Sequence, residues 1–108
     1  MNVVVLSGFL AREAVVNGEG KVLRFTVAAK HGYNVKEEKD LIEFVPCTLF
    51  NPSEAIANLF TKEWKGLSLE LKGRVSTSRY EKEGQTVYST QVVVEKNSIN
   101  LLKVNTLA

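Results

Sequence analysis

The chain has 108 residues, which is enough for one domain with one hydrophobic core and too few for a second unit of ordinary size. Apolar residues make up 44% of it and charged residues 24%, an ordinary globular composition that argues against disorder and against a collagen-like repeat. The formal net charge is only +2, so an anionic partner would have to be bound by cations at particular positions rather than by the overall charge.

The beginning of the chain, "MNVVVLSGFL", has neither the basic region nor the cleavage site of a signal peptide, and its apolar run is far too short to span a bilayer. Cys47 is the single cysteine and lies in the apolar run "FVPCTLF", so no disulfide can form within the chain. A buried structural thiol in a reducing compartment is expected. These observations predict a soluble cytoplasmic protein.

Three runs rich in strand-forming residues come first. Residues 3–10 contain many β-branched side chains, and Gly8 among them indicates a bulge or a sharp bend. After turn residues at Asn17, Gly18 and Gly20, the segment "VLRFTVAAK" alternates an apolar face with a polar, cationic face. A charged loop, "HGYNVKEEKD", is expected next, followed by a third strand, "LIEFVPCTLF".

The third predicted strand has two distinct faces, because successive side chains of a strand point in opposite directions. The side chains fall into two sets, Val45, Cys47 and Leu49 against Phe44, Pro46, Thr48 and Phe50. Both sets cannot be core in a small barrel, so the set with the two phenylalanines is expected to face outward. Pro46 cannot donate a hydrogen bond to a neighbouring strand, and a local irregularity is expected there.

The segment "NPSEAIANLFTKEW" is predicted to form the one helix. Asn51 can cap it, Pro52 suits the first helical position, and Glu54 completes a capping-box spacing. Phe60 belongs to an apolar stripe, and Trp64 falls on the same side. Both aromatic side chains are therefore expected in the core rather than at a binding surface.

Two further strands, "LSLELKGRVSTSRY" and "TVYSTQVVVE", flank the turn "EKEG". The polar face of the first gathers cations and ends at Tyr80. A domain over residues 1–96 is expected, with residues 97–108 forming a short C-terminal segment, an edge piece and a frayed end. The order of elements predicts an all-β protein, namely an OB-fold, a five-stranded Greek-key barrel with one helix between strands 3 and 4. Such barrels bind oligonucleotides and oligosaccharides.

Five blocks of sequence carry a resemblance to a known family: "MNVVVLSGFL", "LRFTVAAKHGY", "IEFVPCTLFNPSEAIANLF", "KGLSLELKGRV" and "SRYEKEGQTVYSTQVVV". In this order and at this spacing, the chain up to about Glu95 resembles the bacterial and bacteriophage single-stranded DNA-binding proteins. The resemblance implies a sequence-tolerant binder that coats and protects exposed strands in DNA replication, recombination and repair. It implies a protein of the nucleoid or, if encoded by a phage, of the host cytoplasm.

The resemblance also implies a set of DNA-binding residues. The aromatic positions for base stacking are Tyr33, Phe44, Phe50 and Tyr80. The cations expected along the phosphates are Arg24, Lys30, Lys72, Arg74 and Arg79. Stacking is worth roughly 1–3 kcal/mol per base whatever the sequence, and cations at phosphates release counterions. No catalytic residue, cofactor or metal is implied.

The sequence departs from the family pattern in two respects. The family commonly carries a flexible tail with an acidic tip that recruits partners, whereas this sequence ends in "KVNTLA"; either it is cut short there or this member lacks that function. Several positions that are cationic in well-known relatives are neutral here, namely Val45, Pro46, Ser76 and Ser78. Tyrosine and phenylalanine also replace tryptophan, which reduces the stacking area, so weaker binding is expected.

The same residues also allow other classes of function to be considered for the chain. An OB-fold protein-interaction module of a replication or recombination assembly would use the same aromatic face for docking. An RNA chaperone of the cold-shock type would need adjacent aromatic and glycine motifs that are missing. His31 and Cys47 are single, which argues against a zinc site and a Cys-His nucleophile, so an enzyme is not expected.

Self-association is expected through the first strand. Relatives are usually homotetramers in which the edges of strand 1 pair between subunits, and an exposed strand edge needs a partner. A homodimer or homotetramer is therefore predicted for "NVVVLSGFL". Single-stranded DNA is the expected ligand, a membrane is not, and replication or recombination proteins are further candidate partners.

Overall fold

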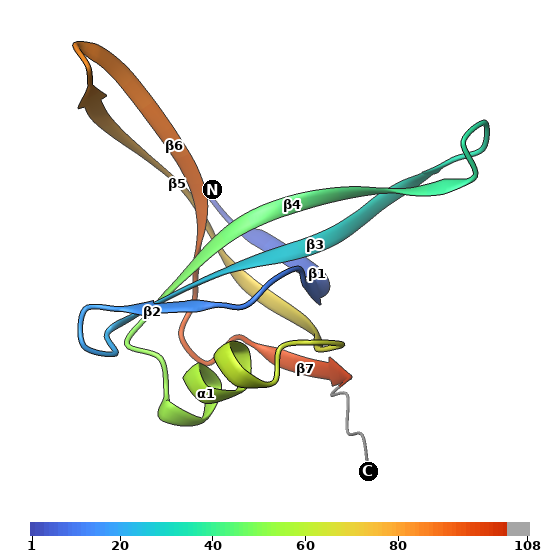
Figure 1. The fold of residues 1–108 in the computed structure, drawn as a ribbon, viewed down its shortest axis with the longest axis horizontal. Helices are drawn as coiled ribbons and strands as arrows, with labels where there is room; N and C mark the ends of the chain where they lie inside the picture. Colours follow the sequence, from blue (N-terminus) through green and yellow to red (C-terminus); the bar gives the residue numbers. More distant parts are fainter. Residues whose placement is uncertain (104–108) are drawn as a thin grey trace.

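The structure is a computed structural model that describes residues 1–103. One sheet and one helix make up this part of the chain (Figure 1). The elements in chain order are β1 (Val4–Leu10), β2 (Val15–Asn17), β3 (Val22–Asn34), β4 (Lys39–Phe50), α1 (Glu54–Lys62), β5 (Ser68–Lys82), β6 (Gln85–Val94) and β7 (Asn100–Lys103). No helix among residues 1–103 is long and apolar enough to cross a membrane.

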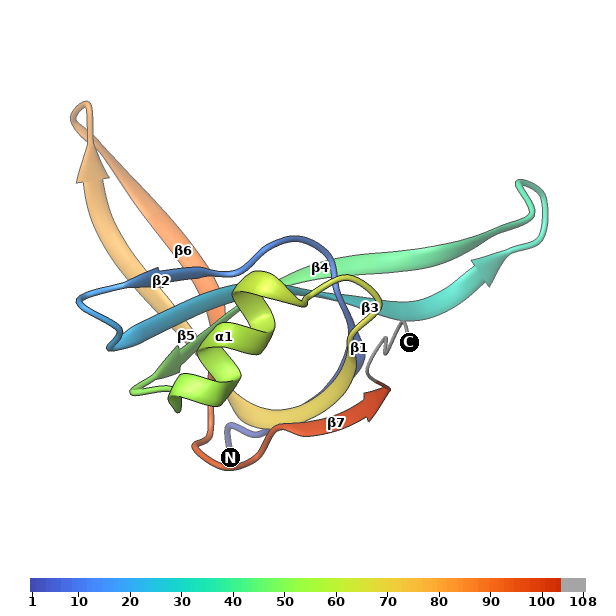
Figure 2. The ribbon, with the colours of Figure 1, turned by 60° about the horizontal axis from the view of Figure 1, so that its bottom comes forward.

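Five of the strands close the sheet on itself. β1 pairs with β3 and with β5, β4 pairs with β3 and β6, and β6 pairs with β5. All of these pairings are antiparallel except the short parallel contact between β4 and β6. This closed ring of five strands, with a helix between the third and fourth, is the predicted OB-fold (Figure 2).

Two long hairpins leave the ring as diverging arms. The β3–β4 arm and the β5–β6 arm project in different directions in Figure 1, while α1 and β7 lie at the opposite end of the molecule. The β5–β6 arm turns through Glu83 and Gly84, both at positive φ, as expected for a tight two-residue hairpin turn.

Alternate residues of the strands fill the ring. The core includes Leu10, Leu23, Phe25, Val27, Cys47, Leu49, Leu67, Leu69, Leu71, Val92 and Val94, all buried. α1 closes one end of the ring (Figure 2), and Phe60 from it meets Phe25 edge to face, with ring centroids 5.0 Å apart. Trp64 is partly buried against the same cluster. The prediction that both aromatic residues belong to the core is confirmed for Phe60, whereas Trp64 lies beyond the end of α1 and is only partly buried.

Gly8 marks the point at which β1 passes between two partners. Phe9 pairs with Ser68 of β5 on one side and with Ala28 of β3 on the other. A Cβ atom on Gly8 would lie 2.2 Å from the carbonyl oxygen of Ala28, closer than any side chain tolerates. The glycine is therefore required by the close approach of β3.

Three local predictions need correction. The expected charged loop "HGYNVKEEKD" is mostly strand, because β3 runs to Asn34 and β4 begins at Lys39, leaving a short turn in which Glu37 N donates to Asn34 Oδ1. Part of the expected turn before the second strand is β2, paired with β3. No register shift occurs at Pro46, which pairs with Thr26 in an unbroken ladder.

The helix begins later than predicted. Ser53 is the N-cap, and its Oγ accepts a hydrogen bond from Ile56 N at 3.2 Å. Asn51 instead has a φ of 53° at the end of β4, and its N–H donates to Lys21 O. Pro52 and Ser53 therefore precede the first helical turn, because the chain must first leave the sheet.

The C-terminal segment contributes an edge strand, β7, which pairs with β5. Ser98 anchors the segment that leads into it by hydrogen bonds to the backbone of Lys72. The predicted frayed end, residues 104–108, lies outside the described residues.

Candidate nucleic-acid interface

The outer face of β4 carries two exposed aromatic side chains. Phe44 and Phe50 are 61% and 48% exposed, whereas Cys47 and Leu49 between them are buried. Residues two apart on a strand share a face, so both phenylalanines point away from the core. The predicted outward parity is confirmed for the two phenylalanines, whereas Thr48 of the same set is only 2% exposed.

Tyr33 reaches the same face through an irregularity in β3. Ala28 pairs with Phe44, so even-numbered residues of β3 share the outer face as far as Lys30. A register shift between Lys30 and Gly32 then changes the parity, and Tyr33 pairs with Asp40 of the outer face. Tyr33 is 52% exposed there. Without the shift, its side chain would point to the opposite face.

The same outer face continues onto the β5–β6 arm. Thr48 of β4 pairs with Val93 of β6, which in turn pairs with Arg74 of β5. From Arg74 the ladder runs without a shift to Tyr80, which pairs with Val87 and is 49% exposed. Cross-strand partners share a face, so Tyr80 and Arg74 lie on the face that also carries the aromatic residues of β3 and β4.

Two arginines lie on this face with free guanidinium groups. Arg24 pairs with Thr48 across β3 and β4, and Arg74 lies on β5. Neither takes part in an ion pair with any carboxylate within residues 1–103. Lys30 is on the same face but its Nζ lies 2.9 Å from Asp40 Oδ1, so its charge is partly compensated.

Arg79 points to the other face of the β5–β6 arm. It is adjacent to Tyr80 in sequence, and neighbouring side chains of a strand point in opposite directions. Its cross-strand partner is Tyr88, which is 64% exposed. The structure therefore separates Arg79 from the four predicted stacking residues, although the sequence sets it beside one of them.

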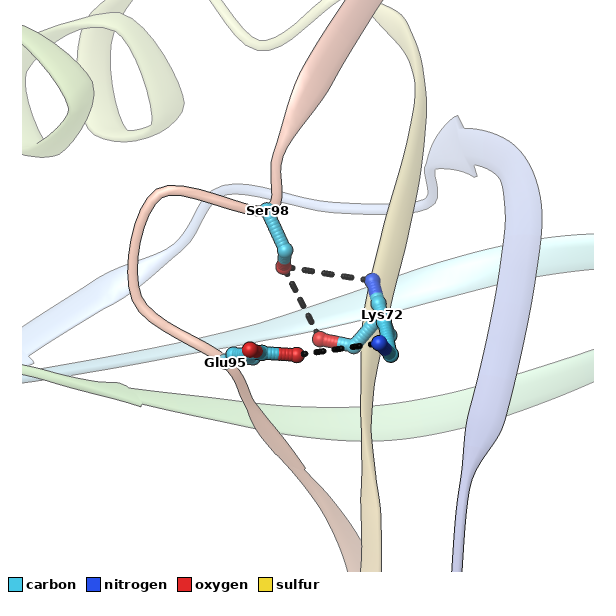
Figure 3. A network of polar contacts seen from close by, with 3 residues as sticks. All are labelled: Lys72, Glu95 and Ser98. Carbon is cyan, nitrogen blue, oxygen red and sulfur yellow. Dashed lines mark hydrogen bonds and ion pairs between the residues drawn. The ribbon is translucent and has the colours of Figure 1, made fainter.

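Lys72 lies two residues before Arg74 on β5 and therefore shares its face, and both residues line one hollow with Val93 and Glu95. Lys72 lies where β5 pairs with β1, opposite Val5. Its Nζ is 3.8 Å from Glu95 Oε2, and its backbone N–H and C=O are both bonded to Ser98 Oγ (Figure 3). The residue thus anchors the segment after β6 to the ring.

One aromatic residue that the sequence analysis did not select joins the face. Phe9 of β1 pairs with Ala28 of β3, and Ala28 pairs with Phe44 of β4. The three side chains form a row across the sheet in which Ala28 is fully buried and Phe9 is 45% exposed. The sequence does indicate this position for Phe9, because it is next to the core residue Leu10 and neighbouring side chains of a strand point to opposite faces.

Cys47 lies just beneath this face, on the core side of β4. Burial raises the pKa of its thiol to about 12, because the thiolate would lose its hydration. The thiol is therefore protonated at neutral pH and does not act as a nucleophile. The prediction of a buried structural cysteine is confirmed.

A closed ring of five strands with one helix between the third and the fourth defines a protein of the OB-fold class, and its outer face here carries exposed aromatic rings and arginines. The model of the single-strand binding protein family matches residues 1–102. The chain therefore belongs to the single-strand binding protein family.

Individual relatives agree with this assignment. A single-stranded DNA-binding protein of Staphylococcus epidermidis is 25% identical over 97 residues, which cover 88% of this chain and 72% of the relative. One of Fusobacterium nucleatum is 34% identical over 100 residues, which cover 87% of this chain and 62% of the relative. This chain thus spans less than two thirds of the second relative's length.

A solved structure shares the fold. It is described as the Plasmodium falciparum SSB complex with ssDNA, and it superimposes with a TM-score of 0.66 at 18% sequence identity. The match covers 94% of this chain and 92% of the other. At this identity the likeness establishes the OB-fold of the chain.

Proposed function

We propose that this protein binds single-stranded DNA without regard to base sequence, by stacking bases on the outer aromatic face and contacting phosphates with arginine and lysine side chains. Membership in the single-strand binding protein family supports single-stranded DNA as the ligand. The observation that carries the mechanism is that Tyr33, Phe44, Phe50 and Tyr80 share one outer face, although they come from three different strands. Each has about half or more of its surface exposed.

The physical reason for low sequence preference is that every base has a flat face. Stacking on an aromatic ring therefore contributes roughly 1–3 kcal/mol for any base. A duplex hides those faces between its own base pairs, so the same surface selects single strands. Stacking and charge contacts require no catalytic group, and we propose a binding protein rather than an enzyme.

The phosphate contacts are proposed to be unequal. Arg24 and Arg74 lie on the aromatic face without ion-pair partners in the described chain, so they are the main candidates. Lys30 would have to exchange Asp40 for a phosphate. Lys72, on the same face as Arg74, would have to exchange Glu95 for a phosphate, and Arg79 would act only if the strand passes around the β5–β6 arm.

Self-association through β1 is part of the proposal. Within the described residues, Val4–Gly8 pair with β5 on one edge, whereas pairing with β3 on the other edge begins only at Phe9. Val3 and Val5 expose apolar surface beside this open edge, at 52% and 74%. An unpaired strand edge of this kind is completed by a second copy of the strand, giving a homodimer or homotetramer.

The biological setting that we propose follows from the family. The protein would coat and protect exposed strands during DNA replication, recombination and repair, in the cytoplasm, where the lone buried thiol remains reduced. Proteins of those processes would then meet it on the DNA.

The test is a titration with fluorescent dT oligonucleotides of graded length, at low and moderate salt, with a duplex of equal length as the control. We expect single strands to bind far better than duplex, to bind more weakly as salt rises, and to lose affinity with Phe44→Ala and Tyr80→Ala. Absence of length-dependent binding by the wild type would reject the proposal and favour an OB-fold protein-interaction module that uses the same face.

A further inference from the structure

A hollow of about 190 Å³ lies on the outer face between Phe44 and Phe50. Pro46 and Thr48 belong to its lining and occupy the two outward positions of β4 between the phenylalanines. At roughly 3.3 Å per residue, the two phenylalanines are about 20 Å apart along the strand. A DNA strand that stacks on both must therefore cross the hollow.

One side of the hollow is polar, whereas Val15, Phe25, Pro46 and Cys47 make the rest of its lining largely apolar. Thr48 is 2% exposed, and its Oγ1 bonds to Oε1 of Gln91 from β6, which also lines the hollow. The amide nitrogen of Gln91 has no hydrogen-bond partner within residues 1–103, so it remains available as a donor. This side of the hollow can therefore offer a hydrogen bond to a ligand.

Two arginines from different parts of the sequence line the same hollow. Arg24 comes from β3, and Arg12 comes from the connection between β1 and β2. Neither forms an ion pair with a carboxylate of the described chain, although Glu13 also lines the hollow. Two guanidinium groups against one carboxylate leave a single excess positive charge, which matches the single negative charge of one backbone phosphate.

We propose that this hollow is a phosphate subsite in which Arg12 and Arg24 together hold one phosphate of a single strand running from Phe44 to Phe50. The inference rests on the proposed function and adds Arg12, which neither the sequence pattern nor the aromatic face selects. The planar guanidinium fork suits a phosphate, because it offers two parallel N–H donors to two oxygens. The negatively charged carboxylate of Glu13 repels the phosphate.

The test compares the salt dependence of dT oligonucleotide binding for the wild type, Arg12→Gln, Arg24→Gln and the double variant. Lys62→Gln on the exposed face of α1 is the matched control, since it also removes one positive charge. We expect each single variant to bind roughly fivefold more weakly at low salt. Because one phosphate is shared, the double variant should lose less than the sum of the single losses, and the slope of log K against log salt should fall by about 0.7 in total.

Glu13→Gln gives a test of opposite sign. Removing the carboxylate should tighten binding, because the phosphate would no longer face a like charge. Weaker binding by this variant would overturn the proposal, since it would mean that Glu13 positions the arginines and that the hollow does not hold an anion.

Other outcomes separate this inference from the proposed function. If the wild type binds single strands and the double variant shows the same slope of log K against log salt as the wild type, the proposed subsite is rejected while the proposed function stands. A slope change of about 1.4 with additive losses would mean that each arginine has its own phosphate, which also overturns the shared subsite. If the wild type binds no single strands, the proposed function fails and the subsite fails with it.

Discussion

Replacing Phe9 by alanine tests how far the stacking face extends. Phe9 and Phe44 flank Ala28 in one row across three strands, and neighbouring strands are about 4.8 Å apart, so the two rings rise from backbones roughly 10 Å apart. Ala28 between them is fully buried, so the two phenylalanines are the exposed side chains of this row. A single strand that crosses β3 from β4 would therefore meet Phe9 next.

The expected loss can be scaled from the exposure of the two rings. A full stacking contact is worth roughly 1–3 kcal/mol per base, and Phe9 is 45% exposed against 61% for Phe44. We therefore expect Phe9→Ala to cost about 1–2 kcal/mol, or roughly a 5- to 30-fold weaker Kd, and Phe44→Ala to cost more. The free energy of unfolding should change less than it would for a core phenylalanine, because nearly half of the Phe9 side chain is already in solvent.

The assay is fluorescence anisotropy with dT oligonucleotides at two salt concentrations, with light scattering to confirm that the assembly state is unchanged. Tyr88→Ala is the control, since Tyr88 is also aromatic and is 64% exposed on the other face of the β5–β6 arm, opposite Arg79. The salt slope of Phe9→Ala should equal that of the wild type, because no charge is removed. Wild-type affinity in Phe9→Ala together with a clear loss in Phe44→Ala would refute the extension of the face onto β1.

Three further predictions concern stability. Gly8→Ala should lower the free energy of unfolding in urea by about 1–3 kcal/mol, because its Cβ would meet Ala28 O at 2.2 Å; an unchanged midpoint would refute the close approach of β1 and β3. Burial raises the pKa of Cys47 to about 12, so the thiol ionises in the unfolded chain at a lower pH than in the folded protein. The free energy of unfolding of the wild type should therefore fall by up to about 1.4 kcal/mol per pH unit from pH 9 to 12. Cys47→Val should show a shallower decline over this range, and a decline equal to that of the wild type would contradict the raised pKa. Ser53→Ala should cost about 1 kcal/mol through loss of the cap on Ile56 N, measured by thermal unfolding, and no loss would mean that another residue caps α1.

The features that could be predicted from the sequence are those set by local periodicity. Alternation in "LIEFVPCTLF" was enough to place Phe44 and Phe50 on the face opposite Cys47, and the apolar stripe of the helix was enough to bury Phe60. The order of the elements was enough to predict the OB-fold. These properties depend on residues a few positions apart, so they survive without knowledge of the partners of each strand.

Local periodicity predicts the wrong bounds for elements whose ends are set by tertiary contacts. The charged segment after the second predicted strand has the composition of a loop, yet it pairs as an arm in which Lys30 and Asp40 form an ion pair. The helix start was set by where the chain leaves β4, which selects Ser53 over Asn51 as the cap.

What the sequence determined by itself was therefore the class of fold, the single core and the outward parity of individual aromatic residues. Which of these residues share a face was decided only by the tertiary structure. The register shift after Lys30 turns Tyr33 outward, strand pairing sets Phe9 beside Ala28, and the closed ring brings Arg12 to Arg24. The physical reason is that register and strand order are fixed by pairing between segments distant in sequence, and a shift of one residue moves a side chain to the other face.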